Sequence, residues 1–277
     1  MTGTLYIVST PIGNMEDITL RALRVLKEAG LIAAEDTRRT KKLLDHYAIK
    51  TPATSYFEHN EKEKGPLLIE KLKAGADIAL VSDAGTPGIS DPGYRLIKAA
   101  IENSIPVVSI PGPSALVSVL SVSGLPLDQF TFKGFIPSGS GQRRKFLLGL
   151  KTPAHTFVMY ESPRRVKETV DAVLEVVGDV ELVVAREMTK MHEEVLRGRA
   201  GAVRELIKER NLKGEVTIVI RTGGLEERTS TPGEEIEELL KAGFHLKDVV
   251  KAVAQEFDIP KGEVYREALR IKERLGL

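Results

Sequence analysis

Three turns rich in glycine and proline are the segments of this chain best suited to bind a small ligand through their backbone. They cover residues 10–14, 82–93 and 111–115, and each directly follows a short apolar run. Glycine lets a ligand approach the main chain, and proline removes freedom that binding would otherwise have to freeze. None of the turns carries the G-x-x-x-x-G-K-[ST] or G-x-G-x-x-G pattern that cradles phosphates, which argues against a nucleoside triphosphate or a dinucleotide.

The apolar runs before these turns are predicted to be strands of one parallel sheet. Alternation of short apolar runs with helical patterns is typical of a parallel sheet that helices cover on both faces. Ligands bind at the carboxyl ends of strands in such sheets, so we expect the three turns to form one site. The first α/β domain is predicted over residues 1–112. Its predicted strands are 5–8, 31–34, 78–81 and 107–110, and its predicted helices are 18–29, 38–47, 66–74 and 94–103.

A second α/β domain is predicted over residues 113–224, and a helical tail over residues 225–277. The tail resembles a helix-turn-helix, and its apolar positions can close a small three-helix core. It is acidic as a whole and net basic only over residues 261–277. The second domain is predicted to hold strands at 130–135, 156–160, 182–185 and 216–220 and helices at 114–123, 165–177 and 202–210, and the tail helices at 234–241, 246–257 and 263–275.

Composition and charge limit the classes of function. The 40 basic and 39 acidic side chains nearly cancel, so contact with nucleic acid must come from local basic patches. The absence of cysteine excludes a disulfide, a thiolate nucleophile and a cysteine-type zinc site. The histidines show no spacing typical of metal ligands, and we expect no metal. With no signal peptide and no apolar run near the roughly 20 residues of a membrane span, the sequence predicts a soluble, cytoplasmic protein.

Seven motifs, in order along nearly the whole chain, resemble those of the ribosomal RNA small-subunit methyltransferase I family, a branch of the tetrapyrrole-methylase superfamily. They read STPIGNMEDITLRAL, AEDTRRTKKLL, VSDAGTPGISDPG, PGPSAL, YESPRR, AREMTKMHEEVLRG and KGEVTIVI. The resemblance implies two α/β domains with S-adenosyl-L-methionine as the methyl donor in a cleft between them. It also implies a homodimer, 16S rRNA or the small ribosomal subunit as partner, and the ribose 2′-hydroxyl of a decoding-centre cytidine as acceptor.

The superfamily pattern, carried over residue by residue, implies donor contacts in the turns and in the strands of the second domain. A sulfonium nucleoside needs backbone hydrogen-bond partners, an apolar wall and negative potential near the sulfur. For Asp83 and Asp91 two roles stay open: a contact with donor or substrate, or capping of the turn. The other implied donor contacts are Ala84, Gly85, Thr86, Pro87 and Ile89 in the second turn, with Pro11, Ser114, Ala115, Met159, Tyr160, Ala185 and Thr217 elsewhere.

The implied reaction requires positioning and a proton acceptor. Methyl transfer from a sulfonium is an in-line displacement in which positioning provides most of the acceleration. A ribose hydroxyl has a pKa far above neutrality, so a carboxylate base would accelerate the transfer by roughly 10²–10⁴-fold. The candidates are Glu187, Asp36 and Glu161, each after a predicted strand, and we rank Glu161 last. The alternative for each is an ion pair with a neighbouring basic residue.

Basic residues near the same sheet edge are candidates for contact with RNA phosphates. Such contacts give affinity without reading the sequence. The segment SGSGQRRKF is predicted to be a mobile basic arm, and the alternative is a helix start whose charges face water. The tail either contacts RNA through residues 261–277 or only packs on the body. The candidates for phosphate contact are Arg38, Arg143, Arg144, Lys145, Arg164 and Arg165, whereas the motif at residues 59–61 has no assigned role.

Two other functions would explain parts of this sequence. A tetrapyrrole methyltransferase would share the fold and the donor, but it should end near residue 224 and requires a large apolar cleft. A non-catalytic RNA-binding module would explain the basic patches but would leave the three turns without a purpose. Calorimetry with the donor separates the RNA-binding module from both enzymes.

Overall fold

The computed structural model describes residues 2–152, 154–223 and 231–276. The chain forms two compact units, of which the first comprises Met1–Ser118 with Met188–Met191 and the second comprises Val119–Glu187 with His192–Leu277. The predicted boundary after residue 112 falls inside the first unit. The predicted boundary after residue 224 lies outside the described residues.

The first unit is built on a five-stranded parallel sheet with strand order β3-β2-β4-β1-β5. The three inner strands β2, β4 and β1 are apolar because helices bury them on both faces, whereas the edge strands β3 and β5 are partly exposed. Only β3 was not predicted, since its three residues carry no apolar run. The strands are β1 (Leu5–Val8), β2 (Leu31–Ala34), β3 (Ala53–Ser55), β4 (Ile78–Val81) and β5 (Val107–Ile110).

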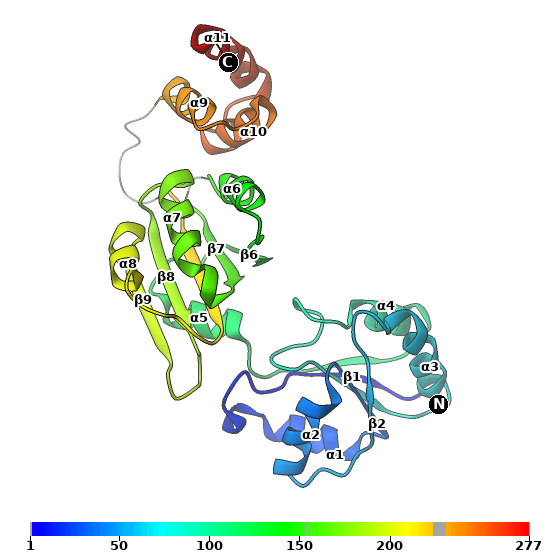
Figure 1. The fold of residues 1–277 in the computed structure, drawn as a ribbon. Coiled ribbons are helices and arrows are strands. Elements are labelled where there is room, and N and C mark those ends of the chain that lie inside the picture. Colours follow the sequence, from blue (N-terminus) through cyan, green and yellow to red (C-terminus); the bar gives the residue numbers. More distant parts are fainter. Residues whose placement is uncertain (1, 153, 224–230, 277) are drawn as a thin grey trace. The chain divides into compact units, whose positions relative to one another are not determined.

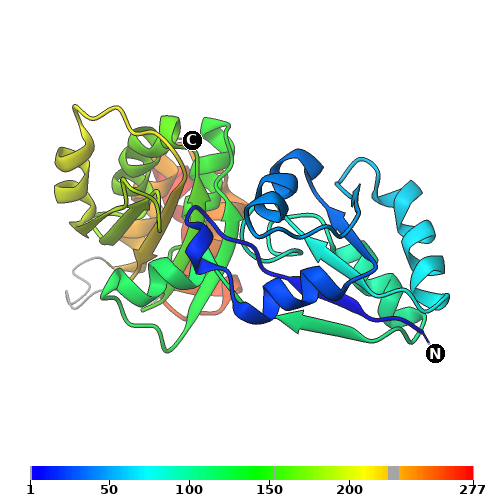
Figure 2. The ribbon, with the colours of Figure 1, turned by 90° about the horizontal axis from the view of Figure 1, so that it is seen from below.

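Two pairs of helices cover the two faces of this sheet (Figure 1 and Figure 2). Successive strand residues point to opposite faces, so Ala79 packs with α1 (Leu20–Glu28) and α2 (Thr37–His46), whereas Ile78 packs with α3 (Glu61–Lys73) and α4 (Tyr94–Glu102). This arrangement leaves the carboxyl ends of the strands to the turns that follow them.

The second unit is built on a mixed five-stranded sheet with strand order β6-β7-β10-β8-β9. Strand β6 runs parallel to β7, and the other three pairs are antiparallel. The polar strand β9 was not predicted. The strands are β6 (Phe130–Phe135), β7 (Thr156–Glu161), β8 (Glu181–Arg186), β9 (Glu194–Arg199) and β10 (Val216–Arg221), and the helices are α5 (Ala115–Ser123), which begins in the first unit, α6 (Ser140–Leu148), α7 (Val166–Val176) and α8 (Ala200–Ile207).

The predicted helical tail consists of three helices, α9 (Pro232–Lys241), α10 (Leu246–Glu256) and α11 (Lys261–Leu275). Thr231 and Glu234 form a capping box at the start of α9, which satisfies backbone N–H groups that the helix leaves without partners. The apolar faces of the three helices join the hydrophobic core of the second unit. In the described part of the chain, no helix combines the length and the apolar character that crossing a bilayer requires.

Candidate functional site

The turns after β1 and β4 are joined directly to one another. These strands are neighbours in the sheet, and beyond them the backbone N–H of Thr10 donates to the carbonyl of Gly85 at 2.9 Å while the N–H of Gly85 donates back at 3.0 Å. The hydroxyl oxygens of Ser9 and Thr86 lie 2.7 Å apart. Because Thr10 pairs with both backbone groups of Gly85, this buried glycine joins the two turns, and the backbone groups beside it remain for a ligand.

The turn after β5 reaches the same place. Gly85 has a φ of +76°, and a Cβ atom built on it would lie 3.7 Å from Ile12 Cγ2 and 3.9 Å from the carbonyl oxygen of Pro113. A Cβ on Gly112 would lie 3.0 Å from the Cβ of Ser9, a tighter contact than most Cβ atoms make, so this position favours glycine. The structure therefore brings the three turns together at the carboxyl ends of the strands, as their positions after the predicted strands indicate.

The donor candidates of these turns form a partly exposed surface. Gly85 and Pro87 are buried, and Ile89 is exposed, which leaves it available as an apolar wall. Between these extremes lie the half-buried residues Pro11, Asp83, Ala84, Thr86, Ser114 and Ala115.

Three of the four donor candidates of the second unit form one row across its sheet. Thr217 of β10 pairs with Tyr160 of β7 on one side and with Ala185 of β8 on the other. Side chains alternate between the two faces of a strand, so Met159 points away from this row and packs in the core under the helices. Any donor contact of Met159 therefore has to come from its backbone.

Glu161 is a buried carboxylate held in an ion pair, so the structure favours the ion-pair alternative for it. Its side chain has no exposed surface. The Oε1 atom accepts from Arg165 Nε at 2.8 Å and the Oε2 atom accepts from the hydroxyl of Thr169 at 2.6 Å. A base needs an accessible lone pair within reach of the substrate. The same ion pair occupies Arg165, which weakens the prediction that Arg165 binds phosphate.

Asp36 caps α2 and binds the neighbouring arginine. Its Oδ1 atom accepts from the backbone N–H of Arg38 at 2.8 Å, and its Oδ2 atom accepts from the guanidinium of Arg38 at 2.7 Å. These hydrogen bonds hold the pKa of Asp36 well below its usual range. A carboxylate with a lowered pKa is a weak proton acceptor. The structure therefore favours the ion-pair alternative for Asp36.

Glu187 occupies a strained position at the end of β8. Its φ is +51°, in the left-handed region that residues other than glycine rarely adopt. Its Oε1 atom accepts from the backbone N–H of Glu215 at 3.0 Å. Its side chain fills the space that a Cβ on Gly214 would occupy. Strain of this kind is often found at functional sites, and Glu187 stays a candidate base.

A group of carboxylates lies beside the turn at residues 82–93, hereafter the donor turn, and among them only Glu35 was not a candidate from the sequence. The backbone N–H of Asp36 donates to Asp83 at 3.0 Å, and that of Asp83 donates to Glu35 at 3.1 Å. Burial raises the pKa of Glu35 and Asp83. Burial, followed by the charge of Glu35, raises the pKa of Asp91 to about 7. A group that titrates near neutrality is suited to proton transfer, so Asp91 joins the candidates.

The prediction of a mobile basic arm in the segment SGSGQRRKF, residues 138–146, is wrong, because Ser140–Leu148 form α6. Arg143 is only 5% exposed, and it binds Glu168 at 3.1 Å and the carbonyl of Ser138 at 3.1 Å. Buried in this way, its guanidinium cannot reach a phosphate. Gly139 is the N-cap of α6 and Gly141 lies inside the helix, whose apolar end is buried, so the two glycines do not form a flexible hinge.

Arg144 and Lys145 bind acidic groups of their own unit. Arg144 donates to Glu175 at 2.6 Å and lies over the ring of Phe244 at 5.3 Å. Lys145 donates to Asp248 of α10 at 2.9 Å. These contacts join α6 to α7 and to the tail, which explains why the segment is basic without requiring RNA.

Arg38 and Arg164 are the more accessible of the predicted RNA contacts. The Arg38 side chain is 89% exposed. Arg164 is exposed and lines a pocket of about 370 Å³ that also includes Lys167 and Arg210, which sequence reasoning missed. Lys167 donates to the carbonyl of Lys208 at 2.5 Å, and Arg210 binds Glu194 at 2.6 Å. The residues that line this pocket follow β7 and precede β10 along the chain, so they lie at the end of the sheet where Tyr160 and Thr217 stand.

Comparisons with known proteins agree with this architecture. The family model of the Tetrapyrrole (Corrin/Porphyrin) Methylases matches residues 4–204. Ribosomal RNA small subunit methyltransferase I of Halalkalibacterium halodurans is 45% identical over 270 residues, which are 95% of this chain and 93% of that protein. The chain belongs to this family. Membership confirms the resemblance seen in the seven motifs and identifies the chain as a methyltransferase.

Other relatives differ in extent. The Thermotoga maritima protein of the same name is 47% identical over 218 residues, which are 79% of this chain and 98% of that protein, so a family member can be about a fifth shorter. The crystal structure of uroporphyrin-III-C-methyltransferase from Thermus thermophilus is 22% identical with a TM-score of 0.56, and the match covers 79% of this chain and 94% of that one. This likeness confirms the predicted tetrapyrrole-methylase fold.

Proposed function

We propose that this protein transfers a methyl group from S-adenosyl-L-methionine to the ribose 2′-hydroxyl of a decoding-centre cytidine in 16S rRNA. The observation that carries the proposal is the joining of the three turns through Gly85, because it forms a partly exposed, backbone-lined site at the carboxyl ends of parallel strands. The family to which the chain belongs is named for methylation of small-subunit rRNA, which supports the acceptor.

The residues proposed to hold the donor follow from the site. When bound, S-adenosyl-L-methionine supplies an electrophilic methyl group on a sulfonium. Ala84 and Thr86 would offer backbone groups to its polar ends, and Ile89 would cover its apolar surface. In the second unit Tyr160, Thr217 and Ala185 would provide one continuous row of contacts. The carboxylates around Asp83 provide the negative potential that a sulfonium requires.

The proposed proton acceptor is a carboxylate, and the candidates that the structure leaves are Glu187 and Asp91. Glu161 is excluded by burial, and Asp36 is disfavoured by its lowered pKa. Glu187 carries backbone strain, and Asp91 has a pKa of about 7. A base with this pKa combines a useful fraction of the charged form at neutral pH with a reasonable driving force for proton transfer.

The proposed RNA contacts are Arg38 and the pocket lined by Arg164, Lys167 and Arg210. Phosphates neutralised there would provide affinity in a chain whose overall charge is nearly zero.

The proposal also includes the cytoplasmic homodimer that the family resemblance implies. The exposed Phe135, 62% accessible on the edge strand β6, is the kind of apolar surface that subunits bury against one another.

Methyl transfer to competing acceptors tests the proposal. Labelled donor is offered to small ribosomal subunits lacking the modification and, separately, to a corrin precursor. We expect label in the rRNA and none in the macrocycle. Label in the macrocycle alone would favour the tetrapyrrole methyltransferase, whereas a protein that binds RNA but not the donor would be the non-catalytic module.

A further inference from the structure

The motif at residues 59–61 places an acidic side chain in the interior of the first unit. Glu61 begins α3, and only 9% of it is exposed. A buried carboxylate is costly unless it is paired and hydrogen-bonded. Glu61 meets this requirement, because its Oε1 atom accepts from the backbone N–H of Gly93 at 3.1 Å and its Oε2 atom lies 3.3 Å from Arg95 Nε.

The residue before Glu61 fixes the start of α3. The Oδ1 atom of Asn60 accepts from the backbone N–H of Phe57 at 2.8 Å, and its Nδ2 atom donates to the carbonyl of Ser55 at 3.2 Å. Ser55 is the last residue of β3. These bonds hold the turn between β3 and α3, so the position of Glu61 is set by the sheet.

The partner of Glu61 is the residue that closes the donor turn. Gly93 has a φ of +143°, and a Cβ on it would lie 3.1 Å from Leu80 Cδ2 and 3.3 Å from the backbone nitrogen of Gly88. The end of the turn therefore packs against its own middle. Gly93 is also the N-cap of α4, and Glu61 accepts from its backbone N–H as the glutamate of a capping box does.

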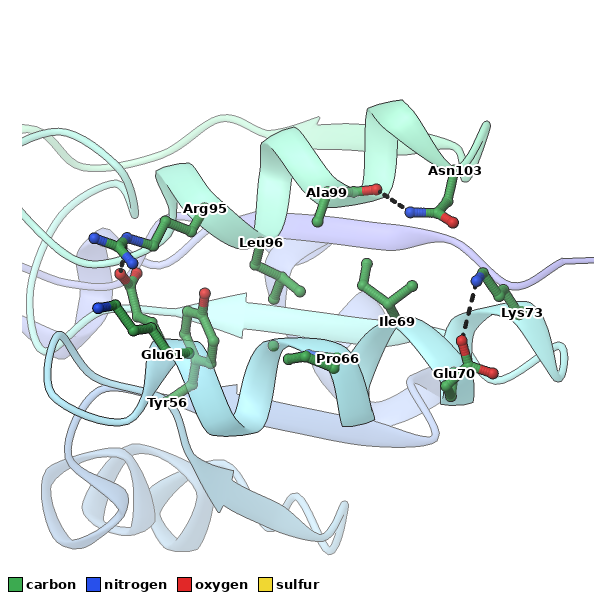
Figure 3. Close-up of a pocket in the computed structure, with 12 residues that line it drawn as sticks. Tyr56, Glu61, Pro66, Ile69, Glu70, Lys73, Arg95, Leu96, Ala99 and Asn103 are labelled. Atoms are coloured by element: carbon green, nitrogen blue, oxygen red, sulfur yellow. Dashed lines mark hydrogen bonds and ion pairs between the residues drawn. The ribbon is translucent and has the colours of Figure 1, made fainter.

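Figure 3 shows Glu61 and Arg95 side by side at one end of a groove between α3 and α4. The groove measures about 420 Å³, and its middle is lined by apolar side chains, among them Ile69 and Leu96. Ile69 therefore contributes to the packing of the two helices, while Glu61 alone of the two contacts Gly93. This separation provides a control that lies on the same helix.

We infer that Glu61 is a positioning residue for the donor turn. By holding the N–H of Gly93 and the guanidinium of Arg95, it fixes the far end of residues 82–93, so that the backbone at residues 84–87 is ordered before the donor binds. A site that is ordered in advance loses less entropy on binding. The inference rests on the proposed function, because it assigns the ordering of this turn to binding of the donor.

Calorimetry with S-adenosyl-L-methionine on four proteins tests the inference. Glu61→Leu removes the acceptor of the Gly93 N–H, and we expect the donor Kd to rise roughly 10- to 100-fold, the loss that accompanies removal of a hydrogen bond to a charged group. Glu61→Gln keeps an acceptor of the same shape but removes its charge, so the hydrogen bond is weaker, and the donor Kd should lie more than about twofold above that of the wild type and below that of Glu61→Leu. Ile69→Ala should lower the melting temperature but leave the donor Kd within about twofold of the wild type.

The outcomes distinguish the inference from the proposed function. A wild-type protein that does not bind the donor would refute the proposed function and, with it, the inference. Wild-type affinity in a folded Glu61→Leu variant would overturn the inference alone. If Glu61→Leu does not fold, the test uses Glu61→Gln and Ile69→Ala. We expect Glu61→Gln to raise the donor Kd more than Ile69→Ala does, although Ile69→Ala lowers the melting temperature more. A larger rise of the donor Kd in Ile69→Ala than in Glu61→Gln would overturn the inference.

Hydrogen exchange at one amide gives a second, independent readout. In the wild type the N–H of Gly93 is bonded to a buried carboxylate and should exchange slowly. In Glu61→Gln it should exchange faster, while the amides of β4 keep their protection. Faster exchange at both places would indicate general destabilisation and would contradict a specific positioning role.

Discussion

Gly85 allows the joining of the turns to be tested by adding a single methyl group. Gly85→Ala places a Cβ at a position where nothing lies closer than 3.7 Å, so the change causes no steric clash. The cost is conformational, because a φ of +76° disfavours an L-residue by roughly 1–2 kcal/mol. We expect the free energy of unfolding of the first unit to fall by about that amount.

The same backbone strain should weaken binding of the donor. If the turn relaxes to relieve 1–2 kcal/mol, the bonds between Gly85 and Thr10 are distorted, and we expect donor affinity to fall by roughly 5- to 30-fold. Differential scanning calorimetry and titration calorimetry measure the two effects on one preparation.

A matched control uses the same chemical change in a helix. Gly141 lies in α6, a Cβ on it would meet nothing within 4 Å, and its φ is not positive. Gly141→Ala should therefore raise stability by up to about 1 kcal/mol and leave donor binding unchanged. Equal effects of the two substitutions, or a Gly85→Ala variant with wild-type stability and donor affinity, would refute the conformational argument.

Four further predictions follow from the site. Thr86→Arg should abolish donor binding in calorimetry while circular dichroism shows an intact fold, because a long cation enters a turn that binds a sulfonium. Glu187→Gln should slow single-turnover methylation at unchanged donor affinity, whereas Asp36→Asn should leave the rate within about twofold, since Asp36 is a weak base and asparagine still caps α2. Because the pKa of Asp91 is raised, the folded protein keeps a proton on this carboxyl that the unfolded chain releases above about pH 4. The free energy of unfolding should therefore fall as the pH rises from about 4 to about 7. In thermal melts across that range, Asp91→Asn should flatten this decline. Arg164→Ala should weaken binding to small subunits and flatten the slope of log affinity against log salt by about 1, whereas Arg144→Ala, whose guanidinium binds Glu175, should leave the slope unchanged.

The sheet of the first unit could be predicted from sequence because burial on both faces makes its strands continuous apolar runs. The joining of the three turns in one site could be predicted from the same pattern, since all the strands of a parallel sheet have their carboxyl ends on the same side. The strands that were missed, β3 and β9, are a short edge strand and a strand rich in charged residues, whose pairing comes from their neighbours. Local patterns contain little information about such pairing.

The candidate site was harder to predict wherever a role depends on three-dimensional partners. Glu161 and Arg143 lie in motifs that look functional, but each is buried beside an opposite charge. The partner of Arg143, Glu168, lies 25 residues away, and the partner of Glu161, Arg165, lies beside a second arginine that could equally have been the partner. Asp91 was noticed, but its raised pKa comes from burial near Glu35, which follows a different strand. Glu61 gave no sequence signal for its role, because its partner Gly93 lies 32 residues away.

The most direct test of the central claim is the chemical position of the transferred methyl group. Small ribosomal subunits that lack the modification are incubated with the wild-type protein and labelled donor, and the labelled nucleotide is mapped and treated with alkali. We expect label on a decoding-centre cytidine whose 3′ linkage resists hydrolysis, because its 2′-hydroxyl carries the methyl group. Label on a base, which leaves the linkage sensitive to alkali, or no label in the rRNA, would contradict the claim.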